Sequence, residues 1–132
     1  MKLLLLTFFL AFSLFASATD NWLHNYDDAV KLAQKEKKNI YLFIGADVCK
    51  FCDLYKINTL SRKDVIQRLQ KNYILLYLSR DRHKVPKQFQ KYGVPRHYFL
   101  NKNGKILFKS YGVLEPPGLF MLLDEADLNA LD

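Results

Sequence analysis

The 132-residue chain has 20 lysines and arginines against 13 aspartates and glutamates, a formal net charge of +7, and half of its residues are hydrophobic. This length predicts one domain, and the apolar content is enough for a core that needs no cross-links. The composition therefore excludes a small scaffold that depends on stapling. Solubility, an anionic membrane surface or acidic protein partners remain as explanations for the positive charge.

Residues 1–18 have the pattern of a secretory signal. One basic residue, Lys2, precedes an apolar run, and Ala16-Ser17-Ala18 supplies small residues at its end. We expect cleavage after Ala18, which leaves residues 19–132 as a single periplasmic or secreted domain without stable membrane insertion. A retained anchor is the alternative, although the apolar run is shorter than the ~20 residues of a spanning helix. Export argues against nucleic acid as a partner.

The first expected element of the mature chain is a helix. Asn25 has the character of an N-cap, with Asp28 at the third helical position, and apolar residues follow at helical spacing. The basic run 35–38 (KEKK) suits the C-terminal end of this helix, where cations complement the helix dipole.

The only two cysteines, Cys49 and Cys52, follow the β-branched and aromatic run 40–44 (IYLFI), which predicts a strand buried on both faces. Apolar residues then recur at helical spacing over 50–60. Cys49 is therefore expected at a strand-to-helix turn, where unpaired N–H groups and the helix dipole stabilise a thiolate. This geometry makes Cys49 the nucleophile and Cys52 the resolving thiol that releases a mixed disulfide.

Another helix and strand are predicted after the cysteines. Ser61 and Asp64 have capping-box spacing, and Val65 begins the apolar face of the helix. The continuous apolar run 73–78 (YILLYL) predicts a second buried strand. It should run parallel to strand 40–44, because a helical segment joins the two.

The last third of the chain predicts a hairpin and a closing helix. A short helix is expected from Pro86 through Tyr92. Strands 96–100 and 106–111 should then pair antiparallel around the turn signal 101–104 (NKNG). The final helix opens at Pro116-Pro117.

The order of these elements, with Cys-x-x-C at the head of a helix and a proline before the hairpin, resembles the thioredoxin fold. The resemblance covers most of residues 22–130. It is closest to exported bacterial thioredoxin-like proteins over 40–55 (IYLFIGADVCKFCDLY), 72–81 (NYILLYLSRD) and 92–95 (YGVP). It implies an α/β fold in which helices flank a central mixed sheet.

The resemblance also implies roles for single residues. Cys49 matches the attacking cysteine of the family, Cys52 the resolving cysteine, and Pro95 the cis proline that faces the disulfide. Val94, before that proline, would present its backbone to a substrate strand.

Two residues separate the cysteines. Lys50 and Phe51 occupy the variable positions that tune the redox potential in this family. A cation at Lys50 favours the thiolate of Cys49, unless it is simply solvated on an exposed turn.

The chain departs from many thioredoxins beside the motif. Val48 replaces a tryptophan, and Phe43 replaces a buried acid, so the usual proton acceptor for Cys52 is missing. Asp47 is the nearest acid, although a solvated turn residue is the plainer interpretation. These departures leave open whether the protein oxidises, reduces or isomerises disulfides.

Other chemistries of the cysteine pair fit less well. A c-type haem site needs histidine after Cys52, where this chain has Asp53. A structural zinc site needs four ligands, and the two cysteines of this chain supply only half of them. A copper site formed by both cysteines and a histidine remains open. His97 is the candidate histidine; the alternative is that His97 is a hydrogen-bonded strand residue. No metal or other cofactor is expected.

The sequence thus predicts an exported thiol-disulfide oxidoreductase. Its partners would be protein thiols or disulfides as substrates, and a redox partner protein that one sequence does not identify. The alternative is a non-enzymatic binding module for a protein or copper with a structural disulfide. Basic residues near the expected substrate edge suit acidic clients or a solvated surface: Arg80, Arg82, Lys84, Lys87, Lys91 and Arg96.

Overall fold

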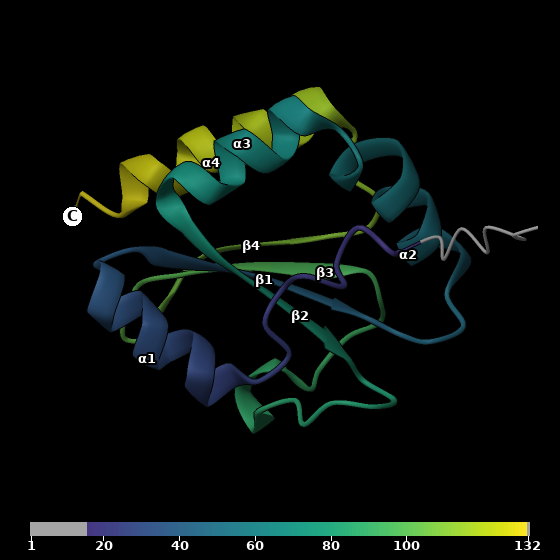
Figure 1. Ribbon diagram of the computed structural model, residues 1–132, viewed down its shortest axis with the longest axis horizontal. Coiled ribbons are helices and arrows are strands. Elements are labelled where there is room, and N and C mark those ends of the chain that lie inside the picture. Colours follow the sequence, from purple (N-terminus) through teal and green to yellow (C-terminus); the bar gives the residue numbers. More distant parts are fainter. Residues whose placement is uncertain (1–15, 132) are drawn as a thin grey trace, which may run out of the picture.

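The computed structural model describes residues 16–131. Its centre is a four-stranded sheet in the order β2-β1-β3-β4 (Figure 1). Strands β1 (Asn39–Gly45) and β2 (Tyr73–Ser79) pair in parallel. Strand β3 (Arg96–Leu100) is antiparallel both to β1 and to β4 (Ile106–Tyr111). The expected mixed sheet, with its parallel pair and its hairpin, is confirmed.

Helices cover both faces of the sheet (Figure 1). Helix α1 (Tyr26–Glu36) packs on one face, and α3 (Lys63–Asn72) and α4 (Pro116–Asn129) pack on the other. Helix α2 (Lys50–Tyr55) begins beyond the end of β1 and continues as a π-helical turn, η1 (Lys56–Leu60).

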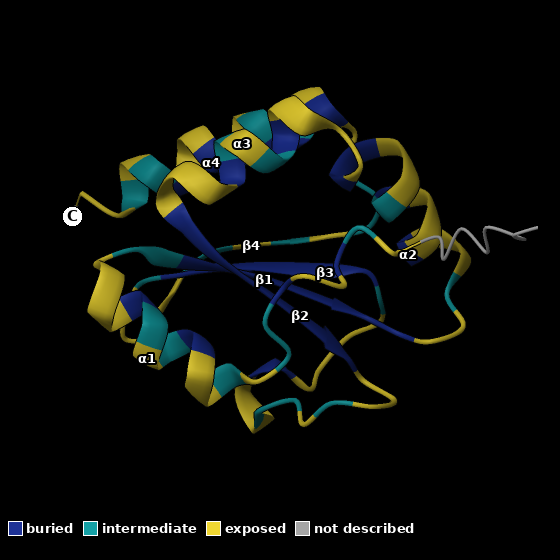
Figure 2. Cartoon of the chain, viewed as in Figure 1, coloured by how far each residue is buried: buried dark blue, intermediate teal, exposed yellow. Residues whose placement is uncertain are grey.

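Because helices lie on both faces, β1 and β2 are buried along almost their whole length (Figure 2). Successive strand residues point to opposite faces, which divides the core in two. The aromatic residues of β1 and β2 face α3 and α4: Tyr41, Phe43, Tyr73 and Tyr77. The aliphatic residues between them face α1: Ile40, Leu42, Ile44, Ile74, Leu76 and Leu78.

The expected signal peptide, residues 1–18, falls outside the described residues except for its last three. Ala18 packs against the core on the α3–α4 side, and Thr19 is buried. Within residues 16–131, no helix has both the length and the apolar character needed to cross a membrane.

One helix cap was predicted correctly and one was not. The Asn25 side chain accepts a hydrogen bond from the Asp28 N–H at 3.0 Å and caps α1 as expected. The Ser61 hydroxyl instead donates to the carbonyl of Ile57, within the preceding π-helical turn. Helix α3 therefore begins one residue later than the capping-box spacing suggested, after Arg62.

The expected helix from Pro86 through Tyr92 is only the 3-10 turn η2 (Lys87–Phe89). The Arg96 guanidinium donates to the carbonyls of Phe89, Tyr92 and Gly93 at 2.6–3.1 Å. Because these carbonyls turn toward Arg96, they do not continue a helix. Arg96 is also buried, which corrects its assignment to a solvated or client-facing basic surface.

The turn between β3 and β4 requires glycine at position 104. Gly104 has a φ of +87°, and a Cβ added there would lie 2.1 Å from the Tyr26 hydroxyl. Gly112 has the same φ, but a Cβ there would meet nothing within 4 Å. Both positions thus require a residue that tolerates a positive φ, but only position 104 also lacks room for a side chain.

We predict that Gly104→Ala destabilises the protein by about 3 kcal/mol, because it adds a clash to the cost of a left-handed alanine. Gly112→Ala is the matched control and should cost about 1 kcal/mol, the backbone part alone. Urea unfolding of both variants measures the difference. Equal losses would mean that the Tyr26 ring moves aside without cost.

Candidate redox site

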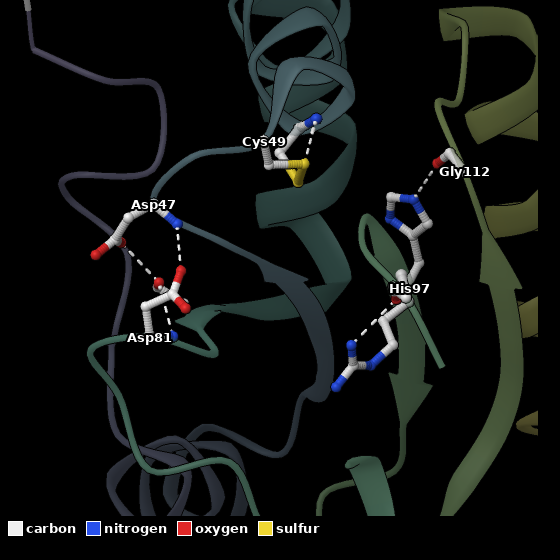
Figure 3. The surroundings of a disulfide bond; sticks show 9 residues. Asp47, Cys49, Asp81, His97 and Gly112 are labelled. Carbon is white, nitrogen blue, oxygen red and sulfur yellow. Dashed lines mark hydrogen bonds between the residues drawn. A yellow bond between two sulfur atoms is a disulfide. The ribbon is translucent and has the colours of Figure 1, made fainter. Parts of the chain in front are cut away.

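Cys49 and Cys52 form a disulfide at the start of α2 (Figure 3). Cys49 is the N-cap residue and is partly exposed, whereas Cys52 is fully buried. The Cys52 N–H donates to Cys49 Sγ at 3.1 Å. A donor aimed at this sulfur favours the thiolate over the thiol, so the arrangement suits an attacking Cys49.

An apolar groove of about 590 Å³ lies beside this pair. Phe51 of α2 forms one wall, and the segments 92–95 and 111–113 form the rest. The peptide bond between Val94 and Pro95 is cis. The fold thus brings three residues singled out from the sequence, Phe51, Val94 and Pro95, to one groove.

Asp47 is engaged away from the sulfurs. Its carboxylate accepts from Arg82 Nε at 2.6 Å and from Ser79 Oγ at 2.7 Å, and its N–H donates to Asp81 Oδ2 at 2.8 Å. The hydrogen bonds from Arg82 and Ser79 hold the pKa of Asp47 below its usual value. Asp47 therefore ties the turn before Cys49 to the end of β2 (Figure 3).

Lys50 is exposed next to Cys49 in the sequence. Arg82, one of the basic residues assigned to the substrate edge, is paired with Asp47.

His97 is a hydrogen-bonded strand residue. Its Nδ1 lies 2.7 Å from the Tyr41 hydroxyl, which in turn lies 2.6 Å from the Tyr55 hydroxyl. Its Nε2 lies 2.8 Å from the Gly112 carbonyl (Figure 3). Since Nε2 donates to this carbonyl, Nδ1 accepts from Tyr41. Both ring nitrogens are thus occupied, which leaves neither for copper.

Within residues 16–131, no three His, Cys, Asp or Glu side chains gather in a way that could hold a metal ion.

Tyr77 is a residue of the site that the sequence did not single out. It lies on β2 opposite Phe43, and its hydroxyl is buried near Cys52. The alternation of β2 places Tyr73, Leu75 and Tyr77 on one face, a pattern visible in the sequence. Which of them would meet Cys52 depends on the register with β1, and the sequence carried no signal for that.

We predict an acid-sensitive stability that depends on His97. Burial lowers the pKa of His97 from 6.5 to about 4, so between these values the unfolded chain binds a proton that the folded protein does not. Stability should therefore fall as the pH drops through this window, by up to about 3 kcal/mol.

Urea unfolding at several pH values between 7 and 4 tests this. His97→Gln should flatten the profile, because glutamine does not titrate. His83, whose pKa burial also lowers, contributes the same slope to both proteins. Parallel profiles for wild type and variant would contradict the assignment.

Known proteins share this fold. A thioredoxin from Thermus thermophilus superimposes with a TM-score of 0.69 and 17% identity, covering 81% of this chain and 87% of that one. A DsbH oxidoreductase gives 0.63 and 16%, covering 79% and 82%. The oxidised C-terminal domain of DsbD from Neisseria meningitidis gives 0.62 and 17%, covering 82% and 98%.

Sequence comparison adds the family to this shared fold. An uncharacterized protein from Archaeoglobus fulgidus is 32% identical over 78 residues, which are 58% of this chain. The match spans 61% of that relative, less than two thirds of its length. The thioredoxin-like family model matches residues 21–102, more than half of the chain. This chain therefore belongs to the thioredoxin-like family.

Proposed function

We propose that the protein is an exported thiol-disulfide oxidoreductase that exchanges disulfides with protein substrates through Cys49 and Cys52. The observation that carries this proposal is the asymmetry of the pair. One sulfur atom belongs to a partly exposed residue beside an apolar groove, and the other to a fully buried residue. A client sulfur can therefore approach only one of them.

This asymmetry orders the chemistry. A Cys49 thiolate attacks a client disulfide, bonds to one client sulfur and releases the other as a thiolate. Cys52, having lost its proton to solvent, then attacks Cys49 Sγ. The bond between Cys49 and the client breaks, its electron pair leaves on the client sulfur, and the pair ends oxidised. The same steps in reverse oxidise a client dithiol.

The groove provides a place for the client chain. Neither the N–H nor the C=O of Val94 forms a backbone hydrogen bond within residues 16–131, so both are available to an extended peptide. Phe51, 59% exposed, and the exposed rings of Tyr92 and Tyr111 add apolar contact area. Pro95 follows Val94 in the lining of the same groove.

Two further residues support the pair in this proposal. Lys50 adds positive charge beside Cys49, which favours the thiolate. Asp47 fixes the turn before Cys49 through its bonds to Ser79 and Arg82.

Export rests on the signal pattern of residues 1–18. Residues 19–132 would then act as one domain in the periplasm or outside the cell, with protein substrates and a redox partner protein. Mass spectrometry of the N-terminus recovered from the exported protein tests cleavage after Ala18.

Cys52→Ser should trap the first step. Without the resolving thiol, Cys49 stays joined to clients, and we expect covalent adducts that disappear on reduction with dithiothreitol. Cys49→Ser is the matched control and should give none, because it keeps only the buried cysteine. Equal adducts from both variants, or none from either, would overturn the assignment of the nucleophile.

The reduction potential of residues 19–132, measured in glutathione buffers, separates enzyme from binding module. A value between about −120 and −270 mV, the range from disulfide donors to reductases, supports the proposal. A pair that resists reduction below about −300 mV would be structural, and a protein-binding module would take its place.

A further inference from the structure

The Tyr77 hydroxyl is a buried polar group without a partner. Tyr77 is 2% exposed, and its hydroxyl has no hydrogen bond within residues 16–131. Its ring is held from two sides, by Phe43 at 5.1 Å between centroids and by Lys56, whose Nζ lies 4.3 Å from the ring centroid. Since an unpaired buried hydroxyl costs free energy, its retention here calls for an explanation.

This hydroxyl and the sulfur of Cys52 border the same small space. A Cβ added to Gly45 would lie 3.0 Å from the Tyr77 hydroxyl oxygen and 3.4 Å from Cys52 Sγ. Gly45, at the end of β1, permits this close approach because it has no side chain. In the disulfide, Cys52 Sγ is bonded to Cys49, and no hydrogen bond links it to Tyr77.

We propose that the Tyr77 hydroxyl donates a hydrogen bond to Cys52 Sγ when the disulfide opens, and so stabilises the Cys52 thiolate that resolves mixed disulfides. Opening the bond lets the two sulfurs separate to van der Waals distance, and Cys52 Sγ can then rotate about its Cα–Cβ bond. The proposal rests on the proposed function. It gives Tyr77 a contact with a reacting atom.

Phe43 supplies no polar group for this role. It pairs with Tyr77 across the parallel strands. A phenylalanine neither accepts a proton from Cys52 nor donates to it. The hydroxyl of Tyr77 is the polar atom that the sheet places beside the sulfur instead.

Tyr77 acts as a donor and not as a base. Burial raises the pKa of Tyr77, so the hydroxyl keeps its proton at neutral pH. The charged and titratable groups around it come from the N-terminal segment, α2, η1 and the turns after β1 and β2: His24, Asp47, Asp53, Lys56, Asp81, Arg82 and His83. Of these, Lys56 lies over its ring.

The hydrogen bond acts in a balanced step. Cys52 loses its proton to solvent, and its thiolate attacks Cys49 Sγ in the mixed disulfide. The Cys49–Cys52 bond forms, the bond between Cys49 and the client breaks, and the client thiolate takes a proton from solvent. Tyr77 keeps its own proton throughout and lowers the cost of the Cys52 thiolate.

Tyr77→Phe tests the proposal because it removes one oxygen atom and keeps the ring. The matched control is Tyr73→Phe, on the same strand and face but about 13 Å away, with its hydroxyl 2.6 Å from Asp127. In the oxidised protein, Tyr77→Phe should not lower stability, because the lost hydroxyl has no partner. Tyr73→Phe should lower it.

The readout is the glutathione equilibrium of the cysteine pair. Loss of a hydrogen bond made only in the reduced form favours the disulfide, so Tyr77→Phe should shift this equilibrium by about tenfold toward the disulfide, about 30 mV more negative. Resolution of a preformed mixed disulfide should slow to a similar degree. Tyr73→Phe should change neither quantity.

A second measurement does not depend on exchange. In Cys49→Ser, Cys52 is the only cysteine, and NMR of its ¹³C-labelled Cβ reports its titration. Adding Tyr77→Phe should raise the pKa of the Cys52 thiol, lowering its acid constant about tenfold. An unchanged Cys52 pKa together with an unchanged equilibrium overturns the proposal and leaves the proposed function intact. A wild-type pair that fails to exchange with glutathione refutes the proposed function, whereas the Cys52 titration still decides the hydrogen bond.

Discussion

The position of β1 at the centre of the sheet is the constraint on which the site depends. Phe43 pairs with Tyr77 of β2 on one side and with His97 of β3 on the other, so these three side chains form one row across the sheet. The row points toward α2, which carries Cys52. A shift of one residue in either pairing would turn its partner to the opposite face and remove it from the cysteines.

The three side chains of this row carry no charge at physiological pH, which limits how they could stabilise the Cys52 thiolate of the proposed reaction. Burial keeps His97 uncharged by lowering its pKa to about 4, and keeps Tyr77 protonated by raising its pKa. Phe43 has no charge to offer. The charged residues Asp47 and Lys50 lie at the surface. In the proposed reaction, this row can therefore offer a Cys52 thiolate a hydrogen bond from Tyr77 but no charge of its own; the nearest cation to the row is Lys56, over the Tyr77 ring.

Local patterns were enough to predict the framework. Buried strands, the Asn25 cap and the strand-to-helix turn at the cysteines depend on neighbouring residues, so the sequence alone revealed them. Arg96 was misread because its burial depends on three carbonyls at and after the end of η2, where the chain does not continue as a helix. The sequence allowed His97 as a hydrogen-bonded strand residue, which is confirmed. The partners of His97 and Tyr77 escaped prediction for a similar reason: they come from other strands and helices, and only the register brings them together.

The two sulfurs face different parts of the molecule, and this separates recognition from chemistry. Cys49 is the partly exposed cysteine, next to the groove of Phe51 and Val94, where a client chain would lie. Cys52 is fully buried next to Gly45 and Tyr77. If the protein acts as proposed, substitutions that reshape the groove would alter the choice of client and leave the surroundings of Cys52 unchanged. The same disulfide could then serve new clients at an unchanged reduction potential.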